Sequence, residues 1–123
     1  MHLTDFKRVK AEKISLLALV TDRILFRPPR GETWWVLHAL VKRRAIAGVV
    51  TDDPAITLQT LGEVGNITTA VDVVNTNLFQ RLLTDGDGAI TYDNPLALSI
   101  TDAPAGATTW DADFIIFLGR VSD

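Results

Sequence analysis

The stretch RPPRGETWWVLHALVKRR, from Arg27 to Arg44, decides the fold. Two prolines and a glycine stand ahead of two adjacent tryptophans, and the apolar run that follows ends at a basic triplet. Proline presets φ and cannot donate to a sheet ladder, and glycine adopts backbone conformations that other residues avoid, so PPRG predicts a turn. We therefore predict a strand over Thr33–Lys42 that carries one tryptophan on each face.

The two faces of this predicted strand differ in their polar members. Every second residue from Trp35 onward forms one parity, and it has no polar member before Arg43. Every second residue from Trp34 onward forms the other parity, which includes a histidine and ends at Lys42. We assign the first parity to the domain core and the second to a covered outer face, where a neighbouring subunit or arm would lie. The predicted core set is Trp35, Leu37, Ala39 and Val41, and the predicted outer set is Trp34, Val36, His38 and Leu40.

Turn-forming clusters separate the other predicted strands. The clusters are TDDP, GEVGN, TDGDG, DNP and DAPAG, and the strands are Ile14–Val20, Ile24–Arg27, Ile56–Leu61, Ile90–Tyr92, Leu96–Thr101 and Trp110–Val121. At most one short helical turn is expected, near Thr69–Val74, because Asn75, Thr76 and Asn77 are poor helix formers. The sequence thus predicts an all-β fold, an antiparallel β-sandwich or jelly roll of residues 14–123 preceded by an extended N-terminal arm of residues 1–13.

Three of these strands are apolar on both faces. Ile14–Val20, Leu96–Ile100 and Phe114–Leu118 all lack the alternation expected of an antiparallel sheet with one solvated face. No convincing amphipathic helix is available as a cover, so another copy, another protein or the arm is expected to cover the outer faces. The alternative is a compact sandwich whose edge residues are half exposed. The predicted oligomer or partner interface consists of Trp34, Val36, His38, Leu40, Phe6, Arg8, Phe114 and Ile116.

Composition excludes several classes of protein. A chain of 123 residues that is 47% hydrophobic is one domain with a substantial core, and the lack of cysteine excludes disulfides, thiolate metal sites and cysteine nucleophiles. The longest apolar run, Ile14 to Val20, is far shorter than the roughly 20 residues that span a bilayer. The opening MHLTDFKRVKAEK lacks the apolar stretch of a secretory signal, so we expect the protein to stay where it is made or to leave by lysis.

Charge is distributed unevenly along the chain. Residues 1–44 hold ten Lys and Arg against four acids, and residues 45–123 hold two against eleven. Either the two parts interleave in space and cancel, or the basic part meets an acidic surface of a neighbouring copy or another partner. Nucleic acid is a weaker candidate, since the arm has no series of stacking aromatics.

No motif predicts catalysis, a cofactor or a metal. Thr84–Asn94 imitates a calcium loop but places Leu83 and Asn94 where the spacing requires Asp and Glu, so a hairpin turn is expected. Asp111 and Asp113 are read as solvent-facing, and His2 and His38 form no ligand cluster. An exposed set of Trp34, Trp35, Tyr92 and Trp110, with acidic loops Asp85–Asp93 and Asp102–Asp111, would instead suggest a carbohydrate- or receptor-binding module.

Three stretches follow one another along the chain: PPRGETWWVLHALV, ITLQTLGEVGNITTAVDVV and YDNPLALSITDAPAGATTWDADFIIFLGRV. In this order of stretches the chain resembles small β-sandwich or jelly-roll structural proteins of tailed bacteriophages, such as capsid decoration, spike and fibre-base modules. The likeness is one of pattern and spans Pro28 to Val121. It implies a non-enzymatic structural role in the virion, assembly with itself as trimers or larger rings, and contact with other virion proteins. The basic leader Met1–Lys13 departs from this pattern and could anchor the protein to the particle.

Overall fold

The computed structural model describes residues 2–61, 65–68, 70–82 and 89–122, and within these ranges the chain is all β, without a helix. The strands form two antiparallel sheets that make a β-sandwich, which confirms the predicted fold class; the jelly-roll variant stays a prediction. The strands are β1 (His2–Ser15), β2 (Val20–Phe26), β3 (Thr33–Asp52), β4 (Ala55–Thr60), β5 (Gly65–Asn66), β6 (Val71–Asp72), β7 (Phe79–Leu82), β8 (Leu96–Asp102) and β9 (Ala105–Ser122).

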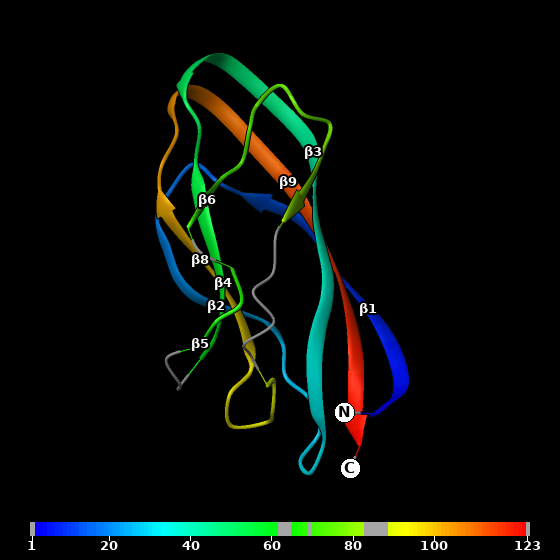
Figure 1. Ribbon diagram of the computed structural model, residues 1–123. Coiled ribbons are helices and arrows are strands. Elements are labelled where there is room, and N and C mark those ends of the chain that lie inside the picture. Colours follow the sequence, from blue (N-terminus) through cyan, green and yellow to red (C-terminus); the bar gives the residue numbers. More distant parts are fainter. Residues whose placement is uncertain (1, 62–64, 69, 83–88, 123) are drawn as a thin grey trace.

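The two sheets are built from nested antiparallel pairs. The first sheet has the order β1-β9-β3-β7, and the second has the order β2-β8-β4-β5, with β6 also paired to β4. Strands β3 and β4 are consecutive and pair with the consecutive strands β9 and β8, so the chain folds as a double ribbon that belongs to both sheets. Both ends of the described chain lie at the same end of the molecule, beside β1 and β9 (Figure 1).

Two glycines let the long ribbon of β3 and β9 bend from one sheet to the other. Gly48 and Gly106 have φ angles of +93° and +83°, and the β3–β9 register shifts on both sides of Gly48. A Cβ on Gly106 would lie 1.8 Å from the backbone oxygen of Val49, so no larger residue fits this backbone. The ribbon curves over at the end of the molecule opposite the chain termini and continues into β4 and β8 (Figure 1).

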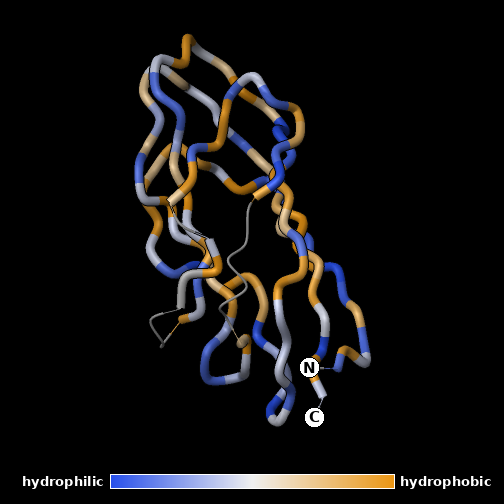
Figure 2. The backbone as a smooth tube through the Cα atoms, viewed as in Figure 1, coloured by the Kyte–Doolittle hydropathy of each residue, from blue (hydrophilic) through white to orange (hydrophobic). Residues whose placement is uncertain are grey.

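The core lies between the two sheets and is supplied by alternate residues of the long strands. Hydrophobic and hydrophilic residues follow each other along these strands (Figure 2), as expected for a face that packs inward. The fully buried side chains of β9 meet those of β4 and β8, so burial of their apolar surface holds the sheets together. These residues are Trp110, Phe114, Ile116, Leu118, Ile56, Leu58, Leu96 and Leu98.

The N-terminal residues belong to the first sheet. Residues 2–13, predicted as an arm, are the first part of β1 and pair with β9 of the same chain. The predicted strand Ile14–Val20 is wrong, because the chain leaves the first sheet after Ser15 and enters the second at Val20. Between them Leu16 is buried, with its N–H donating to the carbonyl of Trp110 over 2.8 Å. This apolar run therefore turns a corner instead of forming a strand.

The turn before β3 is confirmed, but half of the predicted face assignment is wrong. Gly31 has a φ of +86°, and the N–H of Glu32 donates to the carbonyl of Pro29 over 3.2 Å. Past Thr33 the register with β9 shifts between Val36 and His38, so Leu37 is an extra residue in β3. Such a bulge exchanges the two faces of a strand. The buried set is consequently Trp34, Val36, Ala39 and Val41.

The expected helical turn is absent from the described residues near it: Val71–Asp72 is a short strand, and Thr69 lies outside the described part of the chain. The predicted TDGDG turn and part of the GEVGN turn also lie outside the described residues.

Candidate interaction surface

The outer faces of the two sheets differ in chemistry. On the second sheet, Thr57 and Ser99 face each other in register and Ser99 accepts a hydrogen bond from the N–H of Asp22 over 3.1 Å. Gln59 donates to the Asp22 carboxylate, so this part of the outer face is polar, and Ile24 of β2, 43% exposed, is the large apolar side chain beside it. The outer face of the first sheet carries several large exposed apolar side chains. The first sheet therefore carries the candidate interaction surface.

An exposed aromatic and aliphatic group lies on β1, β9 and β3 of the first sheet. Phe6, Leu37 and Phe117 are 71%, 42% and 36% exposed. In the sheet register Phe117 lies between Arg8 of β1 and His38 of β3, and its ring centroid is 6.0 Å from that of His38. Phe6, Arg8, Leu37 and Phe117 line a shallow depression of about 400 Å³. We call Phe6, Arg8, Leu37, His38 and Phe117 the apolar-basic face.

The backbone explains why leucine side chains cross the middle of this sheet. A Cβ on Gly119 would lie 3.0 Å from Leu3 and 3.2 Å from Leu37, so both leucines lie over the position where β9 has no side chain. The bulge at Leu37 places this residue on the outside, next to Phe117. Glycine in β9 and the extra residue in β3 together build the apolar part of the face.

Cations surround the apolar group on the same sheet. Lys10 and Arg81 occupy a row with Ile115 and Leu40, and Lys42 lies opposite Phe79 on β7. Phe79 is 54% exposed, and the Lys42 ammonium is 5.8 Å from its ring centroid. Lys10 forms an ion pair with Glu12 at 3.3 Å. In the described ranges no carboxylate lies within ion-pair distance of Arg8, Lys42 or Arg81, so the surface is basic.

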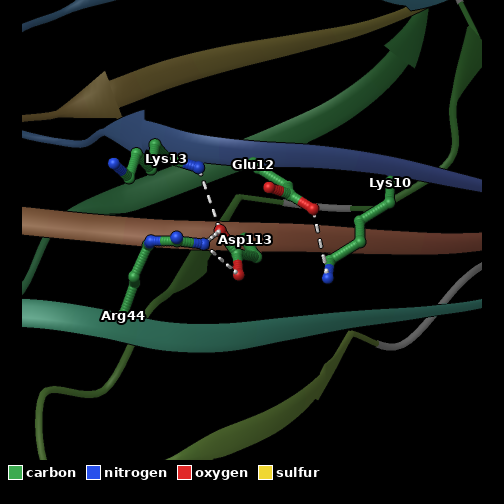
Figure 3. Close-up of polar contacts among 5 residues, drawn as sticks. All are labelled: Lys10, Glu12, Lys13, Arg44 and Asp113. Carbon is green, nitrogen blue, oxygen red and sulfur yellow. Dashed lines mark hydrogen bonds and ion pairs between the residues drawn. The ribbon is translucent and has the colours of Figure 1, made fainter.

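Asp113 is buried on this sheet, and the prediction that it faces solvent is wrong. Its side chain is 3% exposed and accepts hydrogen bonds from the Lys13 backbone N–H at 2.9 Å and from Nη1 of Arg44 at 3.1 and 3.2 Å. Lys13 of β1 and Arg44 of β3 approach it from the two strands that flank β9 (Figure 3). Burial raises the pKa of Asp113, but these hydrogen bonds and the charges of Arg44 and Lys10 outweigh it, so its pKa lies below the ordinary value. The Asp113 carboxylate thus links β9 to β1 and β3 through hydrogen bonds.

The predicted interface residues divide into two groups. Four of them are buried in the protomer: Trp34, Val36, Phe114 and Ile116. The outer placement predicted for Trp34 and Val36 is therefore wrong. The bulge at Leu37 accounts for Trp34 and Val36, whereas Phe114 and Ile116 belong to the parity of β9 that meets the second sheet. Leu40 is half-buried on the outer side. Phe6, Arg8 and His38 do come together on the apolar-basic face.

Leu37 and Phe117 are the surface residues that sequence reasoning missed. For Phe117 the alternation in FIIFL shows only that it faces the opposite side from Ile116, and because both sides of this strand are apolar the sequence does not show which side is the core. For Leu37 no local signal marks the bulge.

The aromatic residues considered for sugar stacking do not form an exposed platform. Trp34 and Trp110 are buried, and the Tyr92 ring is in contact with Arg27 and Arg30, whose guanidinium carbons are 5.0 and 3.8 Å from its centroid. Nε1 of Trp110 has no hydrogen-bond partner in the part of the chain that the structure describes.

The candidate metal and acidic loops are only partly described. Residues 84–88, which begin the considered calcium loop Thr84–Asn94 and overlap the acidic loop Asp85–Asp93, lie outside the described residues. Over the described ranges no three His, Cys, Asp or Glu side chains are grouped as a metal site would require.

Four carboxylates lie together near the turn from β3 to β4. Asp52 ends β3, Asp53 follows it, Asp72 lies on β6 and Asp102 ends β8, and together they line a depression of about 520 Å³. We call these four residues the acidic pocket. Asp53 accepts a hydrogen bond from the N–H of Asn75 over 3.2 Å; within the described ranges none of the four lies within ion-pair distance of a cation. The turn from β3 to β4 lies at the end of the molecule opposite the start of β1 (Figure 1).

Comparison with known proteins gives one informative likeness. No protein-family model and no curated protein sequence matches this chain. Among solved structures it is similar to a chain from the acidic stable capsid structure of Helicobacter pylori bacteriophage KHP30, with a TM-score of 0.65 and 11% sequence identity over 99% of this chain and 97% of that one. At this identity the likeness shows a shared fold. In the residues described, no helix is both long and apolar enough to cross a membrane.

Proposed function

We propose that this protein is a non-enzymatic structural component of a bacteriophage particle. The observation that carries the proposal is the shared fold with a chain of a phage capsid structure, which extends over nearly the whole of both chains. A likeness of this extent involves the entire domain, including the long β3–β9 ribbon, and not a common sandwich substructure. The resemblance of the sequence to structural modules of tailed phages supports the same role independently of the coordinates.

The finer part of the proposal is that the protein assembles with copies of itself, as a trimer or larger ring, in contact with other virion proteins. The apolar-basic face supports it, because Phe6 at 71% exposure and Leu37 at 42% expose apolar surface that a monomer gains nothing by leaving in water. A face with an apolar centre and a charged margin is the usual composition of a protein interface. Decoration, spike and fibre-base positions on the particle are all compatible with such a surface.

Immunogold electron microscopy tests the virion role. Antibodies raised against the purified protein are applied to phage particles from the culture that produces it, with an antibody against an unrelated host protein as the control. We expect gold at a fixed place on the particles at many copies each. Unlabelled intact and disrupted particles, with the protein found only in the cleared lysate, would contradict the proposal.

A further inference from the structure

We propose that copies of this chain bind head to tail, with the apolar-basic face of one copy against the acidic pocket of the next. This inference rests on the proposed function, which requires copies to assemble, and adds which two surfaces meet. The occupant of the apolar-basic face is thus a second copy of the chain.

Charge is complementary between the two surfaces. The apolar-basic face and its margin carry Arg8, Lys42 and Arg81 without a carboxylate within ion-pair distance in the described ranges, and the acidic pocket holds carboxylates without a cation within that distance. The cations of one copy would therefore form ion pairs with the carboxylates of the next copy. Two apolar-basic faces placed against each other would instead oppose cations to cations, which disfavours a symmetric contact.

Apolar contact is available on both sides. Next to the acidic pocket, where the β3–β9 ribbon bends, Val49 is 80% exposed and lies three residues before Asp52. It lies at the bend that the positive φ angles of Gly48 and Gly106 allow. Val49 is therefore a projecting apolar side chain of the size that the shallow depression beside Phe6 and Phe117 accommodates.

Position makes the contact repeatable. The acidic pocket and the start of β1 lie at opposite ends of the molecule, so one copy can use both surfaces at once (Figure 1). A contact between two different surfaces is heterologous, and it closes into a ring when the rotation between copies allows it. Head-to-tail binding therefore leads to rings or filaments and not to a closed pair.

Sedimentation velocity with two complementary variants tests the pairing. The head variant carries Phe6→Ser and Arg8→Ser, and the tail variant carries Asp52→Ser and Asp102→Ser; all four side chains are exposed. Arg23→Ser and Asp93→Ser are matched controls at exposed positions outside both surfaces. Circular dichroism checks that every variant is folded.

The wild-type protein and both controls should show a mass that rises with protein concentration and falls with added salt. Each variant alone should associate at least about tenfold more weakly. An equimolar mixture of the two variants should form one-to-one dimers and nothing larger, because it retains one intact pair of surfaces.

Three results would overturn the inference: a wild-type protein that stays monomeric at every concentration, a tail variant that assembles like the wild type, or a mixture that associates no better than its components. These results are distinguishable from failure of the proposed function, since immunogold labelling of particles reports the virion role whichever surfaces meet.

Discussion

Replacing Trp34 by alanine should destabilise the fold far more than the same change at its neighbour. Trp34 is 7% exposed, its ring lies edge-on to Phe26 at 5.9 Å, and its Nε1 donates to Oε1 of Glu32 over 3.0 Å. A buried tryptophan removes about 150–250 Å² from water, which at about 25 cal/mol per Å² amounts to about 4–6 kcal/mol. Alanine retains a small part of this, so Trp34→Ala should lower the free energy of unfolding by about 4 kcal/mol.

Trp35 provides the matched comparison, because it has the same side chain on the opposite face of the same strand. It is half-buried, and Trp35→Ala should cost about 1–2 kcal/mol. Trp34→Phe keeps an aromatic ring but loses the hydrogen bond to Glu32, so its cost should lie between those of the two alanine variants.

Urea unfolding followed by circular dichroism measures all three variants, at one protein concentration because self-association would shift the midpoint. The slope with urea should stay the same among them. If Trp35→Ala destabilises the protein more than Trp34→Ala does, the face assignment that follows from the bulge at Leu37 is refuted.

Two further predictions concern the sheet and the bend. Asp113→Asn should lower the free energy of unfolding at pH 7 by about 2 kcal/mol; because the pKa of Asp113 is lower in the folded protein, its contribution is present above the ordinary Asp pKa and is lost as pH falls through the folded value. Urea titrations from pH 7 to pH 3 should therefore show the free energies of unfolding of Asp113→Asn and the wild type converging. The control Asp111→Asn, at a half-buried position without a side-chain partner in the described ranges, should stay close to the wild type throughout. A difference between Asp113→Asn and the wild type that stays constant with pH would contradict this prediction. Gly106→Ala should lower the melting temperature much more than Gly31→Ala, because both have positive φ but only at Gly106 would a Cβ collide with backbone, 1.8 Å from an oxygen. Equal shifts in calorimetry would show that the close approach in the ribbon does not matter.

The sequence by itself determined where most strands lie. Period-two alternation and turn residues placed Ile56–Leu61 and Leu96–Thr101 within one residue of β4 and β8 at each end, and PPRG marked the start of β3. These signals are local, because φ preferences and side-chain alternation act over a few residues. The same signals failed for β1, where charged residues on an edge strand leave little apolar pattern.

Only the tertiary structure decided which side chains share a face. The extra residue at Leu37 becomes a bulge because β9 opposes Val36 with Leu118 and His38 with Phe117, and this pairing joins parts of the chain far apart in sequence. One inserted residue reverses the face of everything before it relative to everything after it, so no strand pattern alone could have placed Trp34 inside. The collection of Phe6, Arg8 and Phe117 on one surface, and of the four carboxylates on another, has the same origin, because each set comes from strands that become neighbours only when the sheets form.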